Sequence, residues 1–112
     1  MNVLDDLAAI IADRKTADPN SSWTAKLLSQ GPEKCAAKFG EEAVEAIIEA
    51  VKGDSEALTR EAADVMYHLL VMLASRDVDL ADVLKELARR QGTSGLDEKA
   101  ARDTGNPKVL TK

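Results

Sequence analysis

The sequence predicts a small all-α protein, a helical bundle built around a central antiparallel helix hairpin. Hydrophobic residues make up 45% of the chain but aromatic residues only 3%, so aliphatic side chains must fill the core, which favours helices packed on helices over a sheet. Apolar residues also recur at helical spacing along most of the chain. The length of 112 residues is enough for one domain and too short for two. Because so small a bundle buries a limited part of its surface, we expect a homo-oligomer.

The first helices lie on either side of a turn. Apolar residues from Val3 to Ile11 recur at helical spacing, and this amphipathic helix ends before Pro19. The segment DPNSS forms a turn, after which Ser21 or Ser22 caps a short helix through WTAKLLSQ.

The central hairpin has clear start and stop signals. Gly31 ends the short helix, and Pro32 suits the first position of the next one, which we expect over about residues 33–52. Gly53 then serves as a C-terminal cap and Asp54 as the N-cap of the following helix. With so short a connection, the two helices must be antiparallel neighbours.

The last predicted helix begins after a break near Arg76-Asp77. Asp79 can cap it, and it ends before Gly92. The remaining sequence is polar with little periodicity. We therefore expect one domain over residues 1–102 and a polar, disordered tail over residues 103–112.

The most informative feature is a set of acidic residues on the hairpin. Glu42 pairs with Glu45, and Glu61 with Asp64, because residues three apart on a helix are neighbours on its surface. Glu45 precedes the turn by eight residues, about 12 Å, and Glu61 follows it by seven, about 10 Å. Glu42 and Asp64 lie about one turn farther out on each side. An antiparallel hairpin therefore brings all four carboxylates to the same level.

Carboxylates at close quarters repel one another unless some are protonated or a cation lies among them. Ligation by oxygen alone suits Mg²⁺, with Mn²⁺ as an alternative. A di-iron site is disfavoured, because the one histidine, His68, follows Glu61 by seven residues and Asp64 by four instead of completing a Glu-x-x-His pair. The competing interpretation is that these acids are solvated surface residues. Glu41 and Glu49 are weaker candidates, and Glu41 is either a surface residue or an outer ligand.

Several basic residues are candidates for binding phosphate. They are Lys26, Lys34, Lys38, Arg89 and Arg90. Lys34 and Lys38 lead toward Glu42 at four-residue steps, so they either hold phosphate or form salt bridges with neighbouring acids. The other three are phosphate contacts or ordinary solvated charges.

Other residues restrict the chemistry. His68 either contacts Asp64 or is a structural histidine beside Tyr67, and Cys35, flanked by alanine, is expected in the core. The sequence has no glycine-rich phosphate loop and no Ser/His/Asp set, so water activated by a metal ion is the expected nucleophile.

Net charge, hydropathy and cysteine content restrict the binding partners and the cellular compartment of the protein. The net charge of −5 argues against binding a nucleic-acid polymer. No apolar run approaches the ~20 residues of a membrane span, and the acidic start is unlike a secretory signal. A single cysteine fits a reducing cytoplasm.

Two long segments carry a resemblance to a known family. SWTAKLLSQGPEKCAAKFGEEAVEAIIEA and EAADVMYHLLVMLASRDVDLADVLKELARRQGTSGLDEK resemble phosphoribosyl-ATP pyrophosphohydrolases of histidine biosynthesis, within the all-α MazG-like nucleotide pyrophosphohydrolases. The wider group is marked by Glu-Glu-x-x-Glu followed by Glu-x-x-Asp, here Glu41-Glu42-x-x-Glu45 and Glu61-x-x-Asp64. The likeness runs over about residues 3–102. Trp23 stands where the family more often has tyrosine.

The resemblance implies an activity and an assembly. Phosphoribosyl-ATP and water would give phosphoribosyl-AMP and pyrophosphate in the cytoplasm, with Mg²⁺ held by Glu42, Glu45, Glu61 and Asp64 in a homodimer. One of these ligands or Glu41 would act as the base. One cysteine and one histidine are too few for the zinc site of the cyclohydrolase to which some relatives are fused.

Two rival functions remain at this stage. Within the same group, the chain would be a housecleaning pyrophosphatase of deoxynucleoside or aberrant nucleoside triphosphates. In a different class, it would be a non-catalytic helical interaction module whose carboxylates are solvated.

Overall fold

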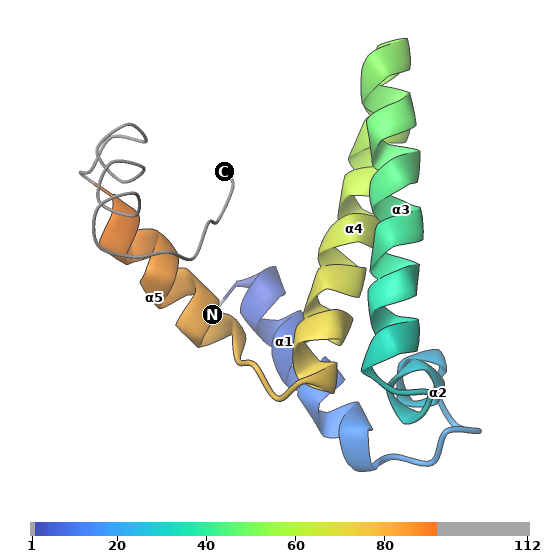
Figure 1. Cartoon of the computed structure of the whole chain (residues 1–112), viewed down its shortest axis with the longest axis vertical. Coiled ribbons are helices and arrows are strands. Elements are labelled where there is room, and N and C mark those ends of the chain that lie inside the picture. The colour runs from blue at the N-terminus through green and yellow to red at the C-terminus, as the bar shows by residue number, and fades with distance from the viewer. Residues whose placement is uncertain (1, 92–112) are drawn as a thin grey trace. The chain divides into compact units, whose positions relative to one another are not determined.

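The computed structural model describes residues 2–91. Its elements are α1 (Val3–Asp13), the 3₁₀ turn η1 (Arg14–Thr16), α2 (Trp23–Ser29), α3 (Pro32–Lys52), α4 (Ser55–Ser75) and α5 (Leu80–Arg90) (Figure 1). The described residues contain no strand, which confirms the predicted all-α class. The chain divides after Leu80 into two compact units, the first with α1 to α4 and the second with most of α5.

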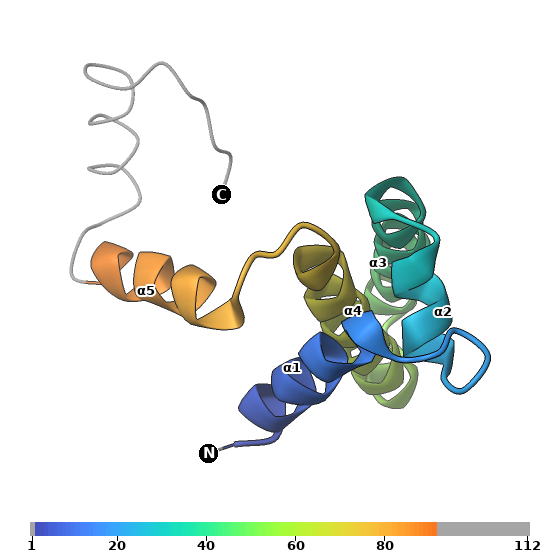
Figure 2. The same cartoon turned by 90° about the horizontal axis from the view of Figure 1, so that it is seen from below.

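The dominant feature of the first unit is the hairpin of α3 and α4, two helices of 21 residues each that run antiparallel, side by side (Figures 1 and 2). Pro32 occupies the first turn of α3, as predicted. Gly53 ends the helix in the left-handed conformation, with φ of 82°, and its N–H donates to the Glu49 carbonyl. The Asp54 carboxylate accepts from the Ala57 N–H at 3.0 Å and starts α4. Local cap chemistry therefore fixes both arms at the predicted turn.

The core lies between α1, α2 and the ends of α3 and α4 that are remote from this turn. Its buried members are Ile11, Leu27, Cys35, Leu70 and Val71. Cys35 is in the core as predicted, and its thiol donates to the Leu27 carbonyl at 3.4 Å. Of the two predicted caps for α2, the structure uses Ser22, whose Oγ accepts from the Ala25 N–H at 3.0 Å. A hydrogen bond between the Thr24 and Tyr67 hydroxyls joins α2 to α4.

The hairpin exposes a large apolar surface in the single chain. Four aliphatic residues of α3 have between 49% and 83% of their surface exposed: Val44, Ile47, Ile48 and Val51. Leaving so much aliphatic surface in water forgoes the burial that stabilises a small protein.

The second unit is described here by α5 alone. The helix ends at Arg90, before Gly92 as predicted. The predicted end of the domain at residue 102 and the predicted tail over residues 103–112 lie outside the described residues. Among the residues that the structure describes, no helix is long and apolar enough to cross a membrane.

Candidate functional site

Three carboxylates meet at the predicted level of the hairpin. Glu42 and Glu45 come from α3 and Glu61 comes from α4, and one oxygen of each lies within 4.8 Å of the others. Glu42 and Glu61 are half-buried, while Glu45 is exposed. These three residues, here called the carboxylate trio, offer oxygen ligands only, as hard divalent cations prefer.

Glu61 is the most constrained member of the trio. Its Oε1 is buried and has no hydrogen-bond partner. Burial raises the pKa of the Glu61 carboxyl, and the nearby charges of Glu45, Asp64 and Glu42 raise that pKa further. A hydrogen bond with Glu45 that requires the protonated form acts in the same direction. The site thus resists full ionisation while it contains no positive charge.

The other two predicted acids lie around the trio. Asp64 is exposed and is not one of the three residues whose oxygens converge, although its charge acts on Glu61. Glu41 is also exposed, and its carboxylate forms an ion pair with the Lys38 ammonium, with 3.4 Å between Oε1 and Nζ. The structure therefore brings Glu42, Glu45 and Glu61 together, and the ligand role of Asp64 stays a prediction.

The predicted phosphate-binding cations fall into two groups. Lys38 contacts Glu41, whereas Lys26 and Lys34 are exposed and make no ion pair with another described residue. In α5, Arg89 and Arg90 both bind the Glu86 carboxylate, at 2.7 and 2.8 Å. These hydrogen bonds lower the pKa of Glu86 to about 2.

His68 lies in the interior and is not fully satisfied. It is 7% exposed, and its ring meets the Tyr67 ring edge-on, with centroids 4.9 Å apart. Its Nδ1 is buried without a hydrogen-bond partner. The structure therefore shows the predicted place beside Tyr67 but not the complete hydrogen bonding expected of a structural histidine.

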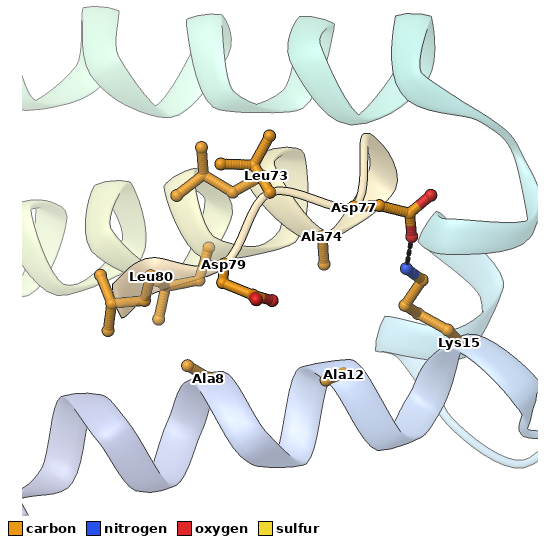
Figure 3. A pocket seen from close by; sticks show the side chains of 10 residues that line it. Ala8, Ala12, Lys15, Leu73, Ala74, Asp77, Asp79 and Leu80 are labelled. Carbon is orange, nitrogen blue, oxygen red and sulfur yellow. Dashed lines mark hydrogen bonds and ion pairs between the residues drawn. The ribbon is translucent and has the colours of Figure 1, made fainter. Parts of the chain in front are cut away.

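Described residues of the first unit line two hollows of different size. One, of about 90 Å³, lies between α1 and the end of α4, with the ion pair of Lys15 and Asp77 on its rim (Figure 3). It is far below the ~300 Å³ of the smallest usual ligand sites. The other, of about 400 Å³, is open and is lined by residues 19–23 and Lys26. Sequence reasoning missed this second hollow, although the single tryptophan of the chain lies on its wall.

The fold and the trio together define the class: an all-α protein whose central hairpin presents clustered carboxylates of the kind that bind divalent cations. The profile of the family described as phosphoribosyl-ATP pyrophosphohydrolase matches residues 4–91. The chain belongs to this family, and is accordingly a hydrolase acting on a phosphoric anhydride bond.

Named relatives agree with this assignment. The phosphoribosyl-ATP pyrophosphatase of Roseobacter denitrificans is 78% identical over 99 residues, which is 88% of this chain and 94% of the relative. The phosphoribosyl-ATP pyrophosphatase of Dinoroseobacter shibae is 74% identical over 102 residues, 91% of this chain and 100% of the relative. That of Ruegeria pomeroyi is 71% identical over 105 residues, 94% of this chain and 100% of the relative.

Proposed function

We propose that this chain hydrolyses phosphoribosyl-ATP to phosphoribosyl-AMP and pyrophosphate, in histidine biosynthesis. The observation that carries the proposal is the carboxylate trio inside the region matched by the family. The names of the relatives from Roseobacter, Dinoroseobacter and Ruegeria supply the substrate. The matches cover 94% to 100% of the length of these relatives.

The trio fits Mg²⁺, or Mn²⁺, on three observations. One oxygen of each residue lies within 4.8 Å of the others, the buried Oε1 of Glu61 lacks a hydrogen-bond partner, and burial together with the neighbouring acids raises the pKa of Glu61. We propose Glu42, Glu45 and Glu61 as ligands, with Asp64 as the fourth. A divalent cation bound there would supply Lewis-acid stabilisation of charge on the phosphates and a lower pKa for a coordinated water.

The side chains around the trio would handle the substrate. Lys34 and Lys38 lie on α3, four and eight residues before Glu42, and we propose that they hold phosphate oxygens. In the structure Lys38 pairs with Glu41 at 3.4 Å, so binding phosphate would exchange one anionic partner for another. The proton of the attacking water would pass to a trio carboxylate or to Glu41, which is exposed and adjacent. Lys26, Arg89 and Arg90 remain proposed phosphate contacts.

The bond that breaks can be tested directly. In ¹⁸O-labelled water, attack at the α-phosphorus places the label in phosphoribosyl-AMP and leaves the pyrophosphate unlabelled. Orthophosphate as the primary product would refute the proposal. Label in the pyrophosphate would keep the bond but move the attack to the β-phosphorus.

Substrate choice needs a second measurement. Turnover of phosphoribosyl-ATP is expected to exceed that of dUTP, dCTP and ATP by a wide margin in kcat/KM. A preference for a deoxynucleotide would instead identify a housecleaning pyrophosphatase. No turnover of any of them, together with no gain in thermal stability at millimolar Mg²⁺, would indicate an interaction module.

We further propose that the protein works as a cytoplasmic homodimer. The exposed aliphatic residues of α3 supply the surface for association, because pairing two hairpins would remove them from water. A biosynthetic role and a single cysteine, which permits no internal disulfide, support the cytoplasm.

A further inference from the structure

The open hollow beside α2 has the size and lining of a ligand site. At about 400 Å³ it lies within the ~300–1,000 Å³ typical of small-molecule sites. Trp23 lines it with 55% of its surface exposed. A tryptophan side chain is large and mostly apolar, so in most proteins it is largely buried. Here an indole ring stands in solvent beside a hollow.

The loop that lines the hollow beside Trp23 is held in place by its own hydrogen bonds. The Asp18 carboxylate accepts from the Asn20 N–H at 2.9 Å, and the Asp18 carbonyl accepts from both the N–H and the hydroxyl of Ser21. Ser22 then caps α2 through the Ala25 N–H. Because these bonds use backbone and short side chains of the loop itself, the hollow is formed before any ligand arrives.

Two polar side chains at the hollow remain available to a ligand. Within the described part of the chain, neither the Asn20 amide group nor the Lys26 ammonium has a hydrogen-bond or ion-pair partner. Lys26 follows Trp23 by three residues, so the two lie on neighbouring parts of the α2 surface. The hollow thus combines a flat aromatic ring, an amide that can both donate and accept, and a cation.

The hollow is tied to the helix that carries part of the trio. The hydroxyl of Thr24, next to Trp23, bonds to the Tyr67 hydroxyl of α4. Tyr67 follows Glu61 by six residues, a rise of about 9 Å along that helix. A ligand in the hollow therefore lies on a helix fixed against the one that positions the carboxylates.

We propose that this hollow binds the purine base of the nucleotide substrate, with the base stacked on the Trp23 indole. Stacking suits any flat heteroaromatic ring. The Asn20 amide can pair with the edge of an adenine ring, as asparagine does elsewhere, and the Lys26 ammonium binds a phosphate near the base. The assignment of substrate rests on the proposed function; the stacking itself does not.

The single tryptophan allows a direct test, because all tryptophan fluorescence reports on Trp23. Phosphoribosyl-AMP, which has the base but no anhydride bond to cleave, should quench this fluorescence saturably. Ribose 5-phosphate, which lacks the base, should leave it unchanged at the same concentrations. Equal quenching by both would reduce the site to phosphate binding and overturn the proposal, and so would quenching by neither.

Kinetics of two variants provide the second test. Trp23→Leu should raise KM for phosphoribosyl-ATP about tenfold, within the range measured when a base–aromatic stack is lost, with little change in kcat. Trp23→Tyr keeps an aromatic ring and should restore KM to within about threefold. Both should melt near the wild-type temperature, because the side chain is half exposed. A wild-type KM in Trp23→Leu would overturn the proposed base site, even if the wild-type protein hydrolyses phosphoribosyl-ATP efficiently.

The experiments distinguish failure of the proposed reaction from failure of the proposed base site. If the wild-type protein does not hydrolyse phosphoribosyl-ATP but phosphoribosyl-AMP still quenches Trp23, the base site stands and the proposed reaction is wrong. If hydrolysis is efficient but phosphoribosyl-AMP does not quench Trp23 and Trp23→Leu keeps the wild-type KM, the reaction stands and the base site is wrong.

Discussion

Among individual residues, Glu61 has the most unusual surroundings. It is the only trio member from α4, and it meets two carboxylates from α3 with one buried oxygen unpartnered. Burial disfavours its charge, and its acidic neighbours do the same, so both effects raise its pKa. The same features that make an ionised Glu61 unfavourable in the metal-free protein make it suitable as a cation ligand.

The pKa of Glu61 gives a pH dependence with a defined sign. In the metal-free protein, folded Glu61 keeps its proton above the ordinary value of 4.5, where the unfolded chain loses it. Unfolding then releases a proton. The free energy of unfolding therefore falls as pH rises from the ordinary pKa of Glu61 to its raised pKa in the folded protein, and it stays low at higher pH. Glu61→Gln should remove this decline. Urea unfolding in EDTA between pH 4 and 8 measures it, with Glu56→Gln, an exposed acid of the same helix, as control. Parallel curves for wild type and Glu61→Gln would contradict the prediction.

Replacing one ligand should separate activity from stability. Glu45→Gln is expected to cut turnover by at least ~10²-fold, because the geometry of the metal site is lost. Its metal-free form should melt no lower than wild type, because the change removes like-charge repulsion from the trio. Steady-state kinetics and thermal melting decide the point, again with Glu56→Gln as the matched control. Near-wild-type turnover in both Glu45→Gln and Glu61→Gln would refute the shared site.

Side-chain detail shows what spacing can and cannot predict. Counting from the turn placed Glu42, Glu45 and Glu61 at one level because helical rise is constant. Counting could not show that Asp64 lies outside the trio. Each residue turns a helix by about 100°, so residues three apart differ by about 60° in direction. With Glu61 directed at α3, Asp64 falls to the side and is exposed.

Among the elements, the α3–α4 connection depends most on single residues. Gly53 has a positive φ that side chains with a Cβ rarely adopt, and Asp54 begins the next helix at once. This turn was predictable because capping is local chemistry. The hollow beside α2 was not, since its shape depends on how the loop over residues 19–22 folds back on itself through Asp18.

Gly40 within α3 and Gly53, the residue that caps α3, should respond to alanine in opposite directions. A Cβ at either Gly53 or Gly40 would meet no atom within 4 Å, so packing does not distinguish them. Gly53→Ala should lower the free energy of unfolding by about 1–2 kcal/mol, the cost of a left-handed backbone for a residue with a Cβ. Gly40→Ala lies within the helix and should raise it by about 0.5–1 kcal/mol. Urea unfolding of the two variants is the measurement, and a change of the same sign in both would contradict this account.

For the whole molecule, the main question is what covers the hairpin. Val44, Ile47, Ile48 and Val51 are exposed in the single chain, although aliphatic residues at helical spacing normally mark a buried face. The sequence shows this periodicity but not whether the face packs within one chain or between two. Periodicity is the same in both cases, so the fold class could be predicted from it and the assembly could not.

The dimer proposal predicts a specific loss of association. Ile47→Glu introduces a charge into the exposed face of α3 and should convert the dimer into monomers, because burying an unpaired carboxylate costs more than association provides. Sedimentation equilibrium of the wild type and the variant measures this. Ile10→Glu is the matched control, an isoleucine of α1 with 49% of its surface exposed, and should leave the dimer intact. Dissociation by Ile10→Glu alone would move the interface to α1.

The turn at Gly53 and Asp54 also restricts how proteins of this architecture can change in length. The level of each carboxylate depends on the number of residues between it and that turn. Inserting seven residues between the turn and the site in one arm alone adds two helical turns, about 10 Å. Each side chain would keep its face of the helix, yet Glu42 and Glu45 would slide away from Glu61. The same insertion in both arms would only lengthen the free end and leave the carboxylates opposed. Insertions and deletions near the turn are therefore compatible with an intact site only in matched pairs, and an unmatched one marks a descendant that has lost it.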